Sequence, residues 1–184
     1  MERPILYVNA CVRKESRTRR LAEQLLAKLG EPYEEIRLED ISFPIVNEEY
    51  LYRRDQLCLR GDYHDPMFDL ARQFSEAETI VIAAPFWDLS FPATLKQYFE
   101  QICVVGLTFY YNDQDMPQGL CRARKLTYVT TAGGPIFDEA FGYGYARTLA
   151  TAFFGIPETR MVKAEGLDIR GADVEGILRK AMNN

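Results

Sequence analysis

Histidine is almost missing from the sequence, since His64 is the only one in 184 residues. A Ser-His-Asp or Cys-His catalytic device would have to use it, and it lies in a polar Gly-Asp-Tyr-His-Asp-Pro segment that is typical of a loop. The cysteines are also uninformative, because Cys11, Cys58, Cys103 and Cys121 are widely spaced and form no C-x-x-C pair. We therefore predict no metal site and no nucleophile activated by histidine.

Long apolar runs and an excess of positive charge are missing as well. No stretch approaches the roughly 18 apolar residues of a membrane-spanning helix, and the run 5–8 is too short for a secretory signal. These features predict a cytoplasmic protein without a membrane partner. The formal net charge of −5 argues against a nucleic-acid partner. One local basic cluster is instead suited to a small anion: Arg13, Lys14, Arg17, Arg19 and Arg20.

Segments typical of strands and helices alternate along the chain. With 47% hydrophobic content, residues 1–184 are expected to form one domain. Apolar, β-branched and aromatic content predicts strands at residues 5–8, 33–38, 79–84, 126–131 and 160–164. Helices are predicted at residues 21–29, 48–59, 68–78, 92–102, 139–154 and 172–182. Ser16 or Thr18 is suited to cap the first helix, and Gly30 to end it.

This alternation predicts an α/β protein with a five-stranded parallel sheet. Right-handed crossovers place helices on both faces of the sheet, which gives a three-layer sandwich, and the flavodoxin-like strand order 2-1-3-4-5 is favoured. In such sheets ligands bind outside the carboxyl ends of the strands. Three segments are therefore candidates for a binding site, namely those that follow the first, third and fourth expected strands.

The segment after the first strand, residues 9–18, gathers hydroxyl and guanidinium groups just before a helix whose first amides lack partners. This combination predicts a phosphate site. In the alternative interpretation, Ser16 or Thr18 is only a helix cap and the arginines form a solvated face. Neither G-x-G-x-x-G nor G-x-x-x-x-G-K-[ST] occurs, so a phosphate ester with few charges fits better than a dinucleotide or a nucleoside triphosphate.

The segments after the third and fourth strands offer an apolar wall and a close backbone approach. Residues 84–92 carry three aromatic side chains and two prolines on a strand-to-helix connection. Residues 130–135 supply two threonine hydroxyls and the pair Gly133-Gly134, which allows the backbone to approach a planar heterocycle. Core packing of the aromatic residues and a plain turn at the glycines are the alternative interpretations.

Several spaced motifs, taken in order along the chain, carry a resemblance to a known family. They are Asn9-Ala10-Cys11 with Ser16 and Thr18, Ala84-Pro85, Leu95-Lys96-Gln97-Tyr98-Phe99, Gly106-Leu107-Thr108-Phe109, Gly133-Gly134 and Ala164-Glu165-Gly166. On these motifs the sequence resembles the FMN-dependent NAD(P)H:quinone oxidoreductase and azoreductase family. The match runs from the first to the last expected strand and is densest between residues 80 and 134.

The resemblance implies FMN as cofactor, NADH or NADPH as reductant, and a set of cofactor-binding residues. The FMN phosphate would be bound by Ser16, Arg17 and Thr18, with Asn9, Cys11 and Arg13 lining the same loop. The isoalloxazine and ribityl groups would be lined by Pro85, Phe86, Trp87, Asp88 and Leu89, and approached from the next strand by Thr131, Ala132, Gly133 and Gly134. Three residues differ from those that family members often carry: Cys11 replaces a serine, Asp88 an asparagine and Ala132 a bulkier polar residue.

The resemblance also implies an activity. Because the flavin itself carries the chemistry, no catalytic side chain is expected, and electrons would pass from the nicotinamide nucleotide through FMN to a small quinone or azo-type acceptor by a ping-pong mechanism. A homodimer is implied, and six aromatic residues belong either to its interface or to the core: Phe137, Phe141, Tyr143, Tyr145, Phe153 and Phe154. The alternatives are a flavodoxin-like electron carrier without substrate turnover and a cofactor-free binding module.

Overall fold

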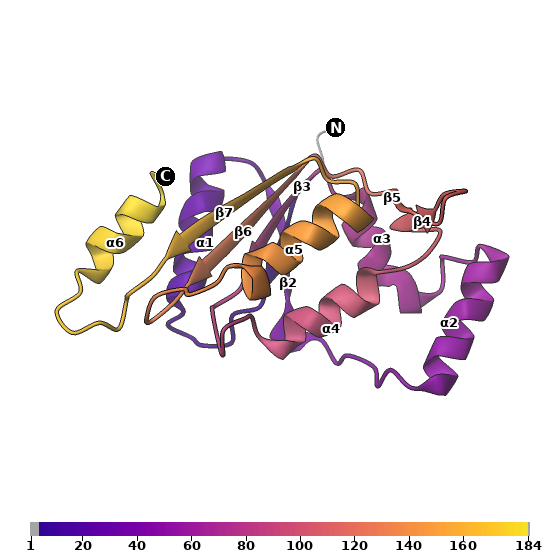
Figure 1. The fold of residues 1–184 in the computed structure, drawn as a ribbon, viewed down its shortest axis with the longest axis horizontal. Coiled ribbons are helices and arrows are strands. Elements are labelled where there is room, and N and C mark those ends of the chain that lie inside the picture. Colours follow the sequence, from indigo (N-terminus) through magenta and orange to yellow (C-terminus); the bar gives the residue numbers. More distant parts are fainter. Residues whose placement is uncertain (1–3, 184) are drawn as a thin grey trace.

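The computed structural model describes residues 4–183 and has a central five-stranded sheet between two layers of helices (Figure 1). The strands are β1 (Ile5–Asn9), β2 (Tyr33–Arg37), β3 (Thr79–Ala83), β6 (Lys125–Thr131) and β7 (Glu158–Ala164). Neighbouring strands pair in parallel, in the order β2-β1-β3-β6-β7. The predicted flavodoxin-like order is therefore confirmed, with the last two strands renumbered because a hairpin precedes them.

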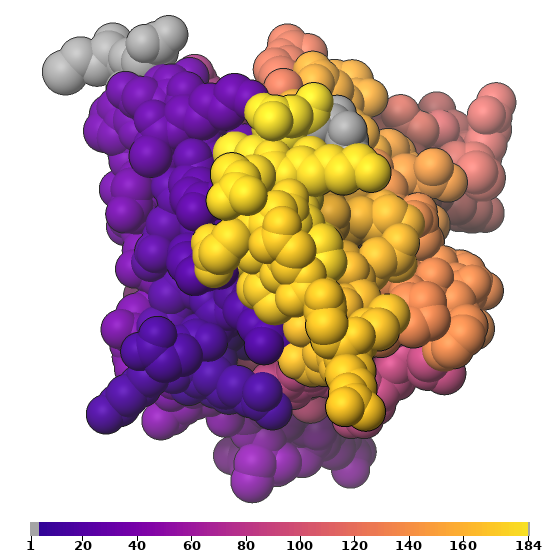
Figure 2. All heavy atoms as spheres, turned by 90° about the vertical axis from the view of Figure 1, so that its left-hand side faces the viewer, coloured from indigo at the N-terminus to yellow at the C-terminus, as the bar shows by residue number. Residues whose placement is uncertain are grey.

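The helices cover both faces of this sheet. They are α1 (Arg17–Leu29), α2 (Glu48–Arg60), α3 (Asp69–Glu76), α4 (Ala93–Ile102), α5 (Tyr145–Thr148) and α6 (Val174–Ala181). α1 and α6 pack on one face, and α3, α4 and α5 pack on the other, while α2 lies farther from the sheet (Figure 1). Figure 2 shows the C-terminal residues directly beside α1, where the Arg20 guanidinium lies 2.8 Å from the Glu175 carboxylate.

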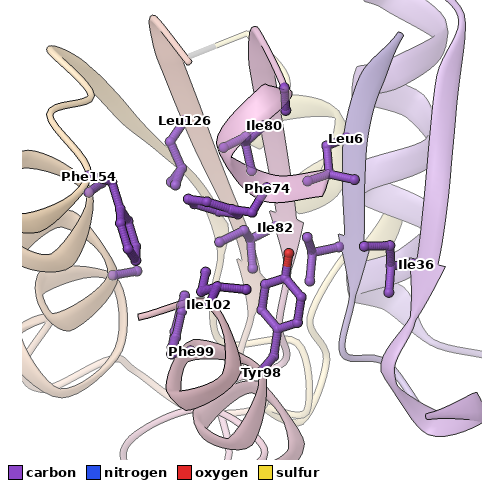
Figure 3. Packing of buried hydrophobic residues seen from close by; sticks show 14 of the residues in the cluster. Leu6, Ile36, Phe74, Ile80, Ile82, Tyr98, Phe99, Ile102, Leu126 and Phe154 are labelled. Atoms are coloured by element: carbon purple, nitrogen blue, oxygen red, sulfur yellow. The ribbon is translucent and has the colours of Figure 1, made fainter. Parts of the chain in front are cut away.

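Side chains of alternate strand residues divide the core into two clusters, because successive residues of a strand point to opposite faces. β3 is apolar at every position after Thr79 and buried on both faces. The cluster toward α3 and α4 includes Leu6, Ile80, Ile82, Leu126, Phe74, Tyr98, Phe99, Ile102 and Phe154 (Figure 3). The cluster toward α1 and α6 includes Tyr7, Val81, Ala83, Leu21, Leu25, Leu26 and Leu178.

Cap residues fix the boundaries of α1. The Ser16 hydroxyl accepts a hydrogen bond from the Arg19 N–H at 3.2 Å, as an N-cap side chain does. Gly30 ends the helix in the left-handed region at φ 71°, and its N–H donates to the Leu26 carbonyl. Of the two predicted caps, Ser16 is therefore the one used. The start of α1 lies directly after the carboxyl end of β1, where the sequence predicts a phosphate site.

A short antiparallel hairpin after α4 was not predicted. It consists of β4 (Phe109–Tyr111) and β5 (Pro117–Gly119). Each strand has three residues, which is too short for a periodic pattern in the sequence. The turn is closed by the Asn112 carboxamide oxygen, which accepts from the N–H groups of Gln114 and Met116, both at 3.0 Å. Hydrogen bonds within the turn stabilise this element, and a hydrophobic pattern in the sequence does not reveal them.

The predicted helix over residues 139–154 is only partly α-helical. Its centre is α5, and π-helical turns flank it at Ala140–Gly144 and Leu149–Phe153. The Gly144 N–H donates to the carbonyl of Glu139, five residues earlier, at 2.7 Å. A Cβ atom at Gly144 would lie 3.0 Å from the Glu139 carbonyl oxygen, so glycine at this position leaves room for the wide turn. Among residues 4–183, no helix combines the length and apolar composition needed to cross a bilayer.

Candidate functional site

A cleft of about 340 Å³ opens at the carboxyl ends of β1, β3 and β6, the edge at which ligand binding is predicted. Four segments form its walls: Val12, Arg13, Glu15, Ser16, Arg17, Thr18, Pro85, Phe86, Trp87, Thr131, Ala132, Gly133, Leu167 and Asp168. Three of these segments are the ones identified in the sequence. The fourth, after β7, was not predicted. A larger hollow of about 960 Å³ on the exposed side of α2 contains none of the predicted site residues.

The start of α1 presents amide groups to this cleft. The first backbone hydrogen bond of the helix joins the Arg20 N–H to the Ser16 carbonyl at 3.0 Å, and the Arg19 N–H is bound by the Ser16 hydroxyl. The N–H groups of Arg17 and Thr18 precede these bonds, so they have no partner within the helix. Together with the partial positive charge of a helix N-terminus, they form a site suited to an anion.

Two predicted threonines from different segments meet in the cleft wall. The hydroxyls of Thr18 and Thr131 lie 2.6 Å apart, and both residues are buried. A hydroxyl has one proton and two acceptor positions, so only one of the pair donates in this bond. The O–H of the other threonine remains for a ligand oxygen. The bond also ties the start of α1 to the end of β6.

Arg17 does not extend freely into solvent. Its guanidinium lies 2.6 Å from the Asp168 carboxylate and 3.4 Å from the Leu167 carbonyl oxygen. The two charged side chains are 40% and 70% exposed, so water screens the pair and its contribution to folding stability is small. The ion pair joins the start of α1 to the segment after β7. It gives the cleft one acidic wall beside a basic one.

The segment after β7 continues the pairing with β6 beyond the sheet. The N–H of Leu167 donates to the Ala132 carbonyl at 3.2 Å, and that of Asp168 to the Gly133 carbonyl at 2.9 Å. A Cβ atom at Gly133 would lie 2.2 Å from the Asp168 carboxylate. Glycine at this position therefore leaves room for Asp168. The sequence analysis explained this glycine only by a close approach to a ligand and did not identify Asp168 as its neighbour. The position of Asp168 after the last parallel strand was the available signal.

The turn after β3 is strained. Trp87 and Ser90 exchange two backbone hydrogen bonds, at 3.0 and 2.8 Å, which leaves a two-residue turn between them. Both turn residues have left-handed backbone angles, with φ 50° at Asp88 and 66° at Leu89. Such angles cost a residue with a side chain about 1–2 kcal/mol, less for aspartate than for leucine. The conformation fixes where Trp87 lies.

The aromatic wall of the cleft is held from two sides. The Phe86 N–H donates to the Thr131 carbonyl at 3.0 Å, which extends the β3–β6 ladder to the start of the turn. The Arg13 guanidinium lies 5.8 Å from the centre of the Trp87 ring, within the range of a cation–π contact. Arg13 thus bridges the segment after β1 and the segment after β3. The cleft is lined both by the Trp87 indole and by the residues at the start of α1.

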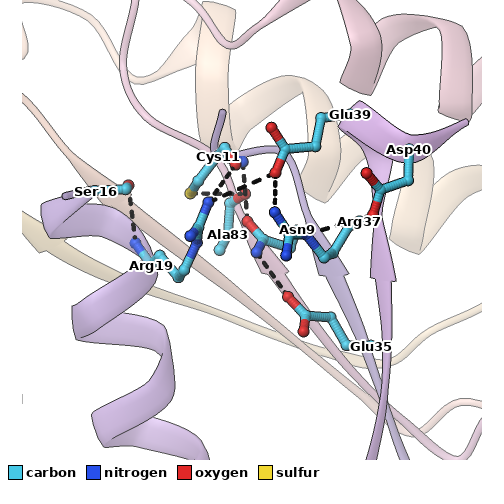
Figure 4. A network of polar contacts seen from close by, with 9 residues as sticks. All are labelled: Asn9, Cys11, Ser16, Arg19, Glu35, Arg37, Glu39, Asp40 and Ala83. Atoms are coloured by element: carbon cyan, nitrogen blue, oxygen red, sulfur yellow. Dashed lines mark hydrogen bonds and ion pairs between the residues drawn. The ribbon is translucent and has the colours of Figure 1, made fainter. Parts of the chain in front are cut away.

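Two predicted residues, Asn9 and Cys11, are not part of the cleft wall, and Figure 4 shows their polar contacts. Asn9 and Cys11 are 1% and 2% exposed. The Asn9 carboxamide accepts from the Cys11 N–H at 2.9 Å and donates to the Glu35 carboxylate at 2.7 Å. Burial raises the pKa of the Cys11 thiol to about 11. The remaining predicted residues outside the cleft wall are Asp88, Leu89 and Gly134.

The cleft is suited to a particular kind of ligand. Free amides, hydroxyls and an arginine gather at the start of α1, and Trp87 with Phe86 forms a flat apolar surface in the same cavity. The first set binds a phosphate group, and the second packs against a planar ring. The arrangement therefore fits a phosphate ester of a flat heterocycle.

Comparison with known proteins places the chain in a family. A family model described as "Flavodoxin-like fold" matches residues 3–184. The chain belongs to this flavodoxin-like family. Among curated relatives of this family member, "FMN-dependent NADH:quinone oxidoreductase 2" of Clostridium acetobutylicum is 36% identical and covers 97% of the chain and 94% of its own length. The enzyme named "FMN-dependent NADH:quinone oxidoreductase" of Clostridium beijerinckii is 33% identical over the same shares. The resemblance found in the sequence is confirmed.

Solved structures similar to this flavodoxin-like protein include azoreductases. An azoreductase from Bacillus anthracis strain Sterne superposes with a TM-score of 0.84 at 23% identity, covering 100% of this chain and 96% of its own. An FMN-dependent NADH-azoreductase from Bacillus anthracis strain Ames Ancestor, solved in complex with FMN, gives a TM-score of 0.82 at 22% identity, covering 100% and 95%. At these identities the likeness shows a shared fold.

Proposed function

We propose that this chain is an FMN-dependent oxidoreductase that passes electrons from a nicotinamide nucleotide, through bound FMN, to a small quinone or azo-type acceptor. The observation that carries the proposal is the cleft, in which the free amides of α1 and the Trp87 ring lie in one cavity. The names of curated relatives at 31 to 36% identity support FMN as cofactor and NADH as reductant.

In this proposal the three predicted segments hold the cofactor. The start of α1, with Ser16, Arg17 and Thr18, would hold the phosphate, and Arg13, whose guanidinium lies 5.8 Å from the centre of the Trp87 ring, lines the same cleft. Residues 85–87 and 131–133 line the cleft and would hold the ribityl group and the ring. When bound, FMN supplies hydride acceptance and electron transfer, so no side chain has to act as a nucleophile or base. The protein binds and orients FMN and excludes water from one ring face.

Absorption spectroscopy of the purified protein tests this proposal first. We expect a flavin spectrum, bleaching on anaerobic addition of NADH or NADPH, and reoxidation by a quinone without a partner reductase. Double-reciprocal plots at several quinone concentrations should be parallel, as a ping-pong mechanism requires. A protein that neither carries nor binds FMN would contradict the proposal. A stable semiquinone without turnover would instead indicate an electron carrier, and intersecting lines would exclude the ping-pong mechanism.

We also propose that the protein forms a homodimer. Two of the six aromatic residues considered in the sequence support it, because Phe137 is 81% and Phe141 is 60% exposed. The other four pack against or within the core cluster around α4. Sedimentation of the purified chain should give twice the monomer mass, and replacing both exposed phenylalanines with serine should shift the equilibrium toward monomer. A wild-type monomer at micromolar concentration would contradict the proposal.

A cytoplasmic location and a single domain over residues 1–184 complete the proposal. All four cysteines are free thiols in the structure, as is usual in a reducing compartment. Cell fractionation tests the location: we expect the chain in the cytoplasmic fraction, and its recovery in another fraction would contradict the proposal. Calorimetry tests the domain: one cooperative unfolding transition is expected, and two separate transitions would contradict it.

A further inference from the structure

The loop between β1 and α1, which carries the proposed phosphate site, is hydrogen-bonded by side chains that do not line the cleft. Both backbone polar groups of Cys11 are bound in this way (Figure 4). The Cys11 N–H donates to the Asn9 carboxamide oxygen at 2.9 Å, and the Cys11 carbonyl accepts from the Arg19 guanidinium at 2.8 Å. Neither Asn9 nor Arg19 is part of the cleft wall. The path of the chain between β1 and α1 is therefore set by these two side chains.

The two side chains that hold Cys11 are themselves held by acidic residues from β2 and the turn that follows it. Asn9 donates to the Glu35 carboxylate at 2.7 Å, across the parallel pairing of β1 with β2. The Arg19 guanidinium lies 3.9 Å from the Glu39 carboxylate, which Arg37 also contacts. Asn9 is 1% exposed and the Arg19 side chain 19%, whereas Glu35 and Glu39 are exposed residues, so the contacts are shielded from water only on the side of Asn9 and Arg19. We name this set of four residues, Asn9, Arg19, Glu35 and Glu39, the loop clamp.

We propose that the loop clamp is a positioning device for the phosphate site, so that acidic side chains of β2 and its turn strengthen the binding of an anionic cofactor. The inference rests on the proposed function, because the anion is the FMN phosphate. Arg19 serves the loop in two ways. Its guanidinium fixes the Cys11 carbonyl, and its own N–H is bound by the Ser16 hydroxyl. The amides ahead of Arg19 are thereby held in place before the ligand arrives, and less order has to be gained on binding.

Simple electrostatics predicts the opposite change in FMN affinity when an acidic residue of the loop clamp is neutralised. Glu35 and Glu39 carry negative charge, and within a Debye length of about 8 Å such charges oppose the binding of a phosphate. If charge alone mattered, neutralising Glu35 would tighten FMN binding. If the clamp positions the loop, removing the contact to Asn9 weakens binding although a repulsive charge has been removed. The sign of one measured change therefore separates the two explanations.

The decisive experiment compares Glu35→Ala with Glu35→Gln. Dissociation constants of the apoprotein for FMN and for riboflavin, which lacks the phosphate, are measured by flavin fluorescence. We expect Glu35→Ala to weaken FMN about tenfold, the typical effect of losing a hydrogen bond to a charged group, with riboflavin unchanged. Glu35→Gln keeps an acceptor for Asn9 and should stay within about twofold of wild type. The glutamine variant thus separates loss of the contact from loss of the charge.

Glu34→Ala is the matched control. It removes the same charge from the neighbouring position of β2, where Glu34 contacts Gln73 at 2.7 Å rather than Asn9. We expect it to leave FMN binding unchanged or slightly tighter. Arg19→Lys provides a second route, since it keeps the positive charge of Arg19 but loses the forked guanidinium; it should also weaken FMN and spare riboflavin.

The possible outcomes are distinguishable. An unchanged or tighter FMN affinity in Glu35→Ala overturns the clamp, and so does an equal loss for FMN and riboflavin, which would indicate general damage to the fold. If Glu35→Ala fails to fold, Arg19→Lys decides in the same way. A wild-type apoprotein that binds FMN no better than riboflavin would instead refute the phosphate site of the proposed function, before any variant is made.

Discussion

The loops after β1 and β3 line the same cleft but are fixed by different means. The loop after β1 is held by hydrogen bonds of its Cys11 backbone with the Asn9 and Arg19 side chains, the first of them buried. The loop after β3 is held by a tight turn with two residues in the left-handed region, and Leu89 at its tip is 55% exposed. The first suits an anion, which requires fixed donors, and the second suits a ring, which requires a fixed flat surface. The comparison predicts that variants in the two loops affect different parts of the ligand.

The largest effect is expected from the loop after β1. Replacing Ser16 and Thr18 together with alanine removes two hydroxyls at the predicted phosphate position, each worth about 1–3 kcal/mol when lost, so the FMN dissociation constant should rise by at least roughly thirtyfold. Riboflavin affinity should change little. Fluorescence titration with both flavins measures this. Thr148→Ala is the control, because that hydroxyl contacts only its own helix at the Gly144 carbonyl. Equal losses for both flavins would remove the phosphate assignment.

The second effect is expected from the loop after β3. Trp87→Ala removes the flat wall and the contact with Arg13, and we expect a loss of about 1 kcal/mol from stacking, or roughly five- to tenfold in affinity. Because the ring is common to both flavins, FMN and riboflavin should weaken alike. Tyr52→Ala on α2, where the side chain is 67% exposed, should change neither. A loss confined to FMN would mean that the two loops do not divide their roles as proposed.

A third prediction concerns the strain in the loop after β3. Leu89→Gly should raise the free energy of unfolding by about 1 kcal/mol, because glycine adopts the left-handed angle without steric cost and the lost side chain is mostly exposed. Urea denaturation measures the change. Leu59→Gly, at an 80% exposed position inside α2, should have the opposite sign and lower stability by about 1 kcal/mol. If both variants are destabilised alike, the turn stores no strain.

The smallest effect is expected at Cys11. Cys11→Ser should leave FMN affinity within about twofold of wild type, because the thiol faces the Ala83 carbonyl behind the cleft. With the pKa of Cys11 raised to about 11, only about one thiol in a thousand is ionised at pH 8, and the reactive thiolate appears only as the pH rises toward that value. Mass spectrometry after iodoacetamide treatment should find Cys11 protected in folded protein. Labelling as fast as in urea would contradict this placement.

Sequence reasoning reached the sheet and three walls of the cleft, because buried parallel strands are continuous apolar runs and their carboxyl ends share one edge. It did not find the hairpin of residues 109–119, where three-residue strands depend on a turn. It also missed the π-helical turns around α5, which have the same apolar spacing as an α-helix. These elements follow from local hydrogen bonds that hydrophobic periodicity does not report.

Within the site, residue type alone did not separate ligand contacts from supporting contacts. Ser16 and Thr18 line the cleft as predicted, but Asn9 and Cys11, from the same stretch, are buried behind it. The difference depends on which way each side chain points after β1, and Glu35 of the neighbouring strand determines that for Asn9. Asp168 was missed because its partner Arg17 lies 151 positions away in the sequence. A single sequence does not show which segments far apart along the chain come into contact.

The contact between Arg17 and Asp168 also constrains the timing of assembly. It joins the first helix to a residue that is synthesised 151 positions later, and the cleft has all four walls only when both segments are in place. During synthesis the cleft therefore lacks one side until residues 167 and 168 have emerged from the ribosome. The strands and helices made before them have to fold without a complete binding cleft.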